Sequence, residues 1–202
     1  MKPEDLKKEY DKYVDQFQSI KTEIESAVVR TESYRGEYYE LFPFSYQRGG
    51  FKRGQPVAAS RKSKSTNNLF TYGFNEGGKI IEVREGIELK DKFHYQFLFY
   101  SENKITLLAY DYDAQLQNVS FGLLNTDQKI EAVFSKGGRG GREERYRYFG
   151  DELRTIEIRQ FDASGDEGPT LFHHFEYGAK GVLVKIAKAN DVEVFDVIYK
   201  AK

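Results

Sequence analysis

The sequence contains no cysteine and no tryptophan, and its charges nearly cancel. The lack of cysteine excludes disulfides and zinc sites built on thiolates. With 31 basic and 32 acidic residues, the chain as a whole lacks the charge of a nucleic-acid-binding protein, although a local patch could provide it. No apolar run approaches the roughly 20 residues of a membrane span, and the charged stretch 1–13 has no apolar core of a signal peptide. We therefore expect a cytoplasmic protein that makes no membrane contact.

Tyrosine and phenylalanine are abundant instead. They make up all of the 15% aromatic content, and their broad rings favour β-strands, where they pack on a half-buried pleated surface. A chain of 202 residues suits one domain, or one domain with an appendage. We divide it into an N-terminal helix (1–35), an irregular basic loop region (36–68) and an antiparallel β-meander (69–202).

The first segment has the pattern of one amphipathic helix. Its apolar residues follow a 4-3-4-3 spacing that places them on one seam: Leu6, Tyr10, Tyr13, Phe17, Ile20, Ile24 and Ala27. We expect this seam to dock on the rest of the protein. The alternative is that the helix pairs with a partner helix, in a dimer or a complex.

The second segment is apolar and aromatic from Tyr38 to Tyr46 and then becomes basic. No acid occurs between Glu40 and Glu76, and several glycines argue against regular structure. The segment is either a mobile surface loop or a cationic contact for an acidic or phosphate-bearing partner. Its cations after the aromatic stretch are Arg48, Lys52, Arg53, Arg61, Lys62 and Lys64.

From Leu69 onward, strand-like runs alternate with polar breaks of mostly two to six residues. Breaks of this length fit hairpins and cannot hold a crossover helix, so consecutive strands should pair antiparallel. One proline, Pro169, lies beyond Pro56, and it falls in a break. The sequence therefore predicts a mainly β fold: a long antiparallel meander, as an open curved sheet or a barrel, with one N-terminal helix.

The β region also contains a repeat, in which an aromatic or apolar residue ends a strand, a polar turn follows, and Ile, Leu or Val begins the next strand. Phe74-Asn75 leads to Ile80 in this way, and we align Tyr112-Asp113, leading to Leu116, with it. Residues 110–119 resemble a tyrosine-aspartate repeat of the RHS type, although the glycine of that motif is absent and Leu116 falls one place early.

RHS repeats build large β-shells that enclose secreted toxins, and this chain is too short for a shell. Small β-rich cytoplasmic proteins of this kind resemble the immunity proteins encoded beside such toxins. By this analogy, the resemblance implies a bacterial protein without enzymatic activity that neutralises a toxin domain by direct binding.

The residues that could carry chemistry form no catalytic, cofactor or metal site that the sequence can identify. His173 and His174 are neighbours on a strand, so they point to opposite faces and cannot chelate one metal. Asp111 and Asp113 are better explained as turn formers. The glycine-rich stretch Lys136–Arg142 has the look of an RGG segment, but it also joins two strands and is not a P-loop.

We therefore expect a surface of exposed tyrosines and basic loops to contact a protein partner, since Tyr and Arg anchor interfaces. The candidate contact residues are Arg61, Lys62, Lys64, Arg139, Arg142, Tyr110, Tyr112, Tyr146 and Tyr148. The alternative function is a carrier for a small hydrophobic ligand, because a meander of about ten strands can close into a barrel with a lined cavity.

Overall fold

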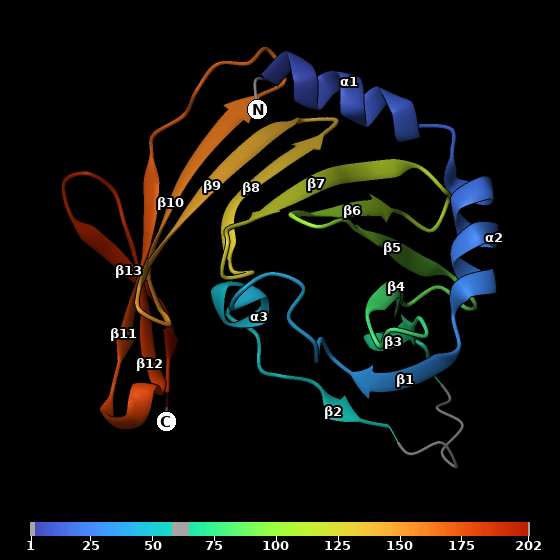
Figure 1. Ribbon diagram of the computed structural model, residues 1–202, viewed down its shortest axis with the longest axis horizontal. Helices are drawn as coiled ribbons and strands as arrows, with labels where there is room; N and C mark the ends of the chain where they lie inside the picture. Colours follow the sequence, from blue (N-terminus) through green and yellow to red (C-terminus); the bar gives the residue numbers. More distant parts are fainter. Residues whose placement is uncertain (1–2, 58–64, 202) are drawn as a thin grey trace.

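Thirteen strands form one open antiparallel sheet in the computed structural model, which describes residues 3–57 and 65–201 (Figure 1). The strand order is β13-β12-β11-β10-β9-β8-β7-β6-β5-β4-β3-β1-β2. From β3 to β13, each strand therefore pairs with the next one along the chain. The predicted mainly β class, with an up-and-down meander and helix at the N-terminus, is confirmed.

The helices are α1 (Pro3–Tyr13), α2 (Phe17–Ala27) and the single turn α3 (Ser45–Arg48), with a short 3₁₀ turn at Ala179–Gly181. The strands are β1 (Arg30–Arg35), β2 (Gln55–Pro56), β3 (Leu69–Phe74), β4 (Ile80–Gly86), β5 (Phe93–Tyr100), β6 (Lys104–Tyr110), β7 (Leu116–Leu124), β8 (Ile130–Gly137), β9 (Gly140–Phe149), β10 (Glu152–Asp162), β11 (Leu171–Tyr177), β12 (Leu183–Ala189) and β13 (Val194–Lys200).

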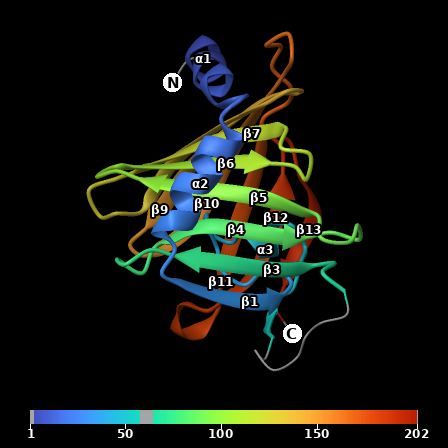
Figure 2. The same ribbon diagram turned by 90° about the vertical axis from the view of Figure 1, so that its right-hand side faces the viewer.

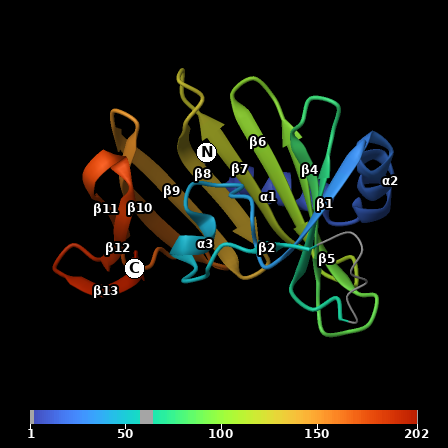
Figure 3. The same cartoon turned by 90° about the horizontal axis from the view of Figure 1, so that it is seen from below.

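The sheet curves around an inner space, and different segments cover its two faces. Helices α1 and α2 lie on the convex face, where α2 crosses the strands (Figures 1 and 2). The segment 36–54, which includes α3, lies on the concave face (Figure 3). We call it the inner segment. Residues of a strand alternate between the two faces of the sheet. Because both faces of the central strands are covered, these strands carry apolar residues on both sides. Phe97 packs on the helical side and its neighbour Leu98 on the inner side.

The predicted helix is interrupted at residues 14–16. Six of the seven seam residues pack on the sheet as expected, whereas Ala27 is exposed. The interruption lets the two helices follow the curved surface (Figure 1). The carbonyl of Tyr13, at the end of α1, accepts hydrogen bonds from the Gln16 N–H (3.2 Å) and from the buried Tyr110 hydroxyl (2.7 Å). A regular apolar spacing cannot reveal such a bend, since both helices use the same seam.

Two segment boundaries also differ from the prediction. Residues Arg30–Arg35, assigned to the N-terminal helix segment, form strand β1, which pairs with β3 along its whole length. The region 36–68, expected to be irregular, contains α3 and the two-residue strand β2. The sheet therefore begins before the basic region. The inner segment is an insertion between β1 and β2, which pair with each other.

Four turns of the sheet share one five-residue form: residues 75–79, 111–115, 125–129 and 162–166. In each, the N–H of the first residue donates to the carbonyl of the fifth, and the N–H of the fourth donates to the carbonyl of the first. The first residue is Asn or Asp, and its Oδ1 accepts the backbone N–H of the fifth. This turn explains the sequence repeat and corrects its alignment, because Tyr110-Asp111, not Tyr112-Asp113, corresponds to Phe74-Asn75.

Candidate functional site

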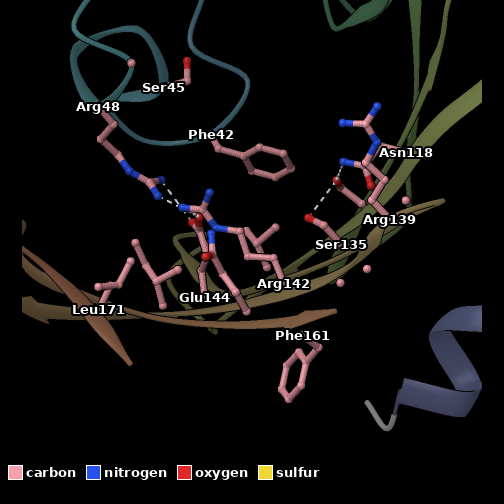
Figure 4. A pocket seen from close by; sticks show the side chains of 18 of the residues that line it. Phe42, Ser45, Arg48, Asn118, Ser135, Arg139, Arg142, Glu144, Phe161 and Leu171 are labelled. Carbon is pink, nitrogen blue, oxygen red and sulfur yellow. Dashed lines mark hydrogen bonds and ion pairs between the residues drawn. The ribbon is translucent and has the colours of Figure 1, made fainter. Parts of the chain in front are cut away.

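An open cavity of about 1360 Å³ lies on the concave face between the sheet and α3 (Figure 4). Strand alternation brings every second residue of β9 into it: Arg142, Glu144 and Tyr146. Leu171 and His173 of β11 line it in the same way. Arg48 reaches into it from α3. We call this space the concave cavity.

A buried network joins α3 to the cavity floor. The guanidinium of Arg48 donates to both carboxylate oxygens of Glu144, from Nη2 at 2.7 Å and from Nη1 at 3.0 Å. Its Nη1 also donates to the Tyr146 hydroxyl (3.2 Å), and its Nε donates to Nδ1 of His173 (3.1 Å). Because the contact partners lie 96 to 125 residues away in sequence, Arg48 fixes the inner segment against the far half of the sheet.

The network sets the charge of each member. Burial opposes ionisation of Glu144, but the guanidinium groups of Arg48 and Arg142 and the Tyr146 hydroxyl together outweigh it, so the pKa of this carboxyl lies below its usual value. Burial, together with the positive charges of Arg48 and Arg142, lowers the pKa of His173 to about 4. The imidazole is therefore neutral at pH 7, and accepting at Nδ1 places its proton on Nε2.

The local sequence explains why α3 forms there. Phe42 and Phe44 anchor the inner segment among the apolar residues of β8–β12. Phe44 takes a left-handed conformation (φ 57°) that starts the turn, and its N–H donates to the carboxylate of Glu40 at 3.0 Å. The other carboxylate oxygen of Glu40 accepts from the Gln47 side chain at 2.8 Å. These contacts leave Arg48 pointing at the cavity floor.

The cavity carries an excess of positive charge. Four cations line it, and among the described residues around it Glu144 is the one acid. Arg142 contacts the same carboxylate as Arg48, and Figure 4 shows both guanidinium groups converging on Glu144. The remaining two cations are Arg139, which is exposed, and Lys188, which is half-buried. One carboxylate thus offsets only part of the charge.

The tyrosines predicted to contact a partner are mostly internal. Tyr110 and Tyr146 are only 1% and 5% exposed, so they are not part of an exposed contact surface. Tyr148 is half-buried, and its hydroxyl donates to the carbonyl of Ile130 at 3.0 Å. Tyr112 is exposed, with Lys92 over its ring and His94 beside it. The sequence alone does not separate the buried pair from Tyr112, because buried and exposed tyrosines follow the same pattern in a sheet that is covered on both faces.

The two basic stretches differ in what the structure shows. Arg61, Lys62 and Lys64 lie outside the described residues. The stretch Lys136–Arg142, expected to be a loop, is mostly strand: Gly137 pairs with Gly140, so only Gly138 and Arg139 form the turn. The structure brings Arg139 and Arg142 together in the wall of the concave cavity.

Three residues of the network were not predicted in the roles that the structure gives them. Arg48 was counted only as a cation of the basic segment, and neither Glu144 nor His173 was singled out as its partner. A signal was available for His173, because Leu171 and Phe175 flank it at alternate positions and mark an inward face. No sequence pattern linked Arg48 to its partners, because they lie 96 to 125 residues away along the chain.

The remaining candidates behave as turn or strand residues. Oδ1 of Asp111 accepts the backbone N–H groups of Asp113 and Gln115, each at 2.9 Å, as a turn former should. His174 faces away from His173 and stacks beside Phe172. Within residues 3–57 and 65–201, no group of three or more His, Asp or Glu side chains is placed to hold a metal ion. In the same part of the chain, no helix has the length and apolar composition needed to cross a membrane.

No family model and no curated protein matches the chain. Among solved structures, the chain is similar to a porin-like protein from Bacteroides uniformis ATCC 8492, with a TM-score of 0.42 and 17% sequence identity. The match covers 62% of this chain and 50% of that protein, so the chain spans about half the length of the protein it matches. A similarity of this size supports no inference about function.

Proposed function

We propose that the protein is a binding module without enzymatic activity of its own, and that it neutralises a bacterial toxin by taking an acidic element of that protein into the concave cavity. One observation carries this proposal: an open cavity of about 1360 Å³ is lined by four cations and one carboxylate. A cationic cleft attracts acidic partners and speeds their association.

The arrangement of the cavity supports a role in binding. Its floor is a rigid, hydrogen-bonded sheet, and its roof, α3, is fixed by Arg48 through hydrogen bonds to Glu144, Tyr146 and His173. A site held in one geometry loses little conformational entropy when a partner docks. The identity of the partner as a toxin rests on the resemblance of residues 110–119 to tyrosine-aspartate repeats.

A hydrophobic-ligand carrier remains the alternative prediction. Aromatic and aliphatic side chains of the inner segment, among them Tyr39, Leu41 and Phe42, already pack against the apolar concave face. A lipid-like ligand would have to displace them. The concave cavity, in contrast, stays open and is charged.

The proposal is tested by protection of cells from the toxin. The product of a toxin reading frame adjacent to the gene is expressed with and without this protein, and growth is measured. Wild type should restore growth, and the double substitution Arg139→Glu with Lys188→Glu should abolish protection, since it reverses two charges at the cavity. Arg147→Glu is the matched control, because Arg147 is exposed and pairs with Glu157 at 2.8 Å instead of lining the cavity. Failure of wild type to protect, or equal protection by the double variant, contradicts the proposal.

A further inference from the structure

A row of polar side chains crosses four neighbouring strands on the floor of the concave cavity. Ser120 of β7 lies opposite Ser135 of β8, Ser135 lies opposite Arg142 of β9, and Arg142 lies opposite Gln160 of β10. Directly opposed residues in a sheet share a face and have Cβ atoms about 5 Å apart. Two hydroxyls, a guanidinium and a carboxamide therefore form one continuous strip, which we call the polar row.

The polar row has hydrogen-bonding capacity that the protein does not use. Nε of Arg142 and Oδ1 of Asn118 are both buried, and neither has a hydrogen-bond partner among the described residues. The Ser120 and Ser135 hydroxyls contact each other at 3.0 Å, and Nδ2 of Asn118 donates to Ser120 at 3.2 Å. Buried donors without partners are rare in folded proteins, and the Nε–H of Arg142 is free to donate to a group that enters the cavity.

Glycines keep the row uncovered. Beside it, Asn118 lies opposite Gly137, and Gly137 lies opposite Gly140. A Cβ atom at Gly137 would come within 2.7 Å of the Gln117 carbonyl oxygen, and one at Gly140 within 2.1 Å of the Phe161 carbonyl oxygen. Both positions therefore require glycine, and as a result no side chain stands over this end of the row.

The charges around the polar row indicate that a group bound there would be negative. The carboxylate of Glu144 contacts both Arg48 and Arg142, so one negative charge is shared by two guanidinium groups. Of these two guanidinium charges one is left without a counterpart, in addition to the charges of Arg139 and Lys188 on the same cavity. A single carboxylate would balance it and could accept from Nε of Arg142 and from the Ser135 hydroxyl at the same time.

We infer that the polar row is the anchor site for one carboxylate side chain, an Asp or Glu of the partner, bound by Arg142 and Ser135. This inference rests on the proposed function, because it identifies the group on the acidic partner that the cavity recognises. It gives the two serines and the glycines of the hairpin a role that the proposal alone does not require.

Acetate serves as the probe for the carboxylate, and inorganic phosphate as the comparison. Each is titrated into the ¹⁵N-labelled protein at constant ionic strength in chloride, and amide chemical shifts are recorded by NMR. Acetate should cause saturable shifts at residues 118–120, 135–137 and 141–143. Arg142→Met should weaken acetate binding at least tenfold and Ser135→Ala at least threefold, whereas the exposed control Arg147→Met should leave it unchanged.

Other results overturn the inference. Absence of saturable shifts, or shifts that survive both Arg142→Met and Ser135→Ala, would show that the row binds no carboxylate. Phosphate binding at least tenfold tighter than acetate would assign the site to a phosphate group instead. Ser135→Ala removes only a hydroxyl, so it remains informative if Arg142→Met fails to fold. Acetate binding needs no partner, so the two proposals can fail separately. If the protein binds acetate but does not protect cells from the toxin, only the proposed function is contradicted. If it protects cells but does not bind acetate, only this inference is contradicted.

Discussion

Two residues in the repeated turns adopt a backbone conformation that suits glycine. The fourth position of the turn has positive φ in all four copies, and it is Gly78, Ala114, Gln128 and Gly165. A side chain in the left-handed region costs roughly 1–2 kcal/mol relative to the right-handed one. Ala114→Gly and Gln128→Gly should therefore each raise the free energy of unfolding by about 0.5–1 kcal/mol, after the entropy of the more flexible unfolded chain is subtracted. Urea denaturation measures the change.

The reverse substitution provides the control. A Cβ atom at Gly78 would meet nothing within 4 Å, so Gly78→Ala changes only the backbone preference. It should lower the free energy of unfolding by about 1 kcal/mol. If Ala114→Gly and Gly78→Ala shift stability in the same direction, the turn conformation does not explain the difference between these positions.

His173 should make the protein less stable in mild acid. Its pKa is about 4 in the folded protein and about 6.5 in an unfolded chain. Between these values the unfolded state binds more protons, so the free energy of unfolding falls as the pH drops from about 6.5 to about 4, by up to about 3 kcal/mol. His173→Asn keeps an acceptor for Arg48 but cannot titrate. Its denaturation curves should show a smaller loss of stability than wild type over this range, and equal slopes would contradict the assignment.

At the scale of elements, the helix seam was predictable and the bend was not. Periodicity placed Leu6, Ile20 and Ile24 on one buried face, and they are 5–7% exposed. Turn residues such as Asn75 and Asp111 fixed the strand order, because each short turn leaves only the adjacent strand for pairing. The inner segment gave no such signal, since its contacts are made by residues that are distant in sequence and its glycines suggested irregular structure.

The docking of α2 is tested by a charge on its buried face. The Phe17 ring lies 5.3 Å from the ring of Tyr95 and 5.2 Å from that of Tyr110, between ring centroids. Phe17→Asp should lower the free energy of unfolding by on the order of 3–5 kcal/mol, because it places an unpaired charge in this cluster. Gln18→Asp changes an exposed neighbour on the same helix and should have little effect. An unchanged melting temperature for Phe17→Asp would show that the helix does not hold the fold together.

At the scale of the whole molecule, Arg48 and Glu144 connect the inner segment to the far half of the sheet. The two substitutions should not be equivalent. Glu144→Leu leaves both Arg48 and Arg142 without their carboxylate and should cost about 3–5 kcal/mol. Arg48→Leu leaves Glu144 paired with Arg142. It should therefore lower the free energy of unfolding by about 1–2 kcal/mol less than Glu144→Leu does. Chemical denaturation of both variants measures the order, and a larger loss for Arg48→Leu would contradict the shared-carboxylate arrangement.

The order of pairing also determines how the molecule responds to a mechanical load. From β3 to β13 every strand is hydrogen-bonded to the strand that follows it in sequence. Tension applied at the C-terminal end therefore separates one pair of strands at a time. Peeling of β13 and β12 breaks neighbouring-strand contacts and apolar packing on their inner faces, including the packing of β13 against the inner segment. At β11 it reaches His173 and at β9 Glu144, both held by Arg48, and the load is then carried across the inner segment to β1. The contacts of Arg48 with His173 and Glu144 thus divide the sheet into a portion that separates readily and a portion that resists.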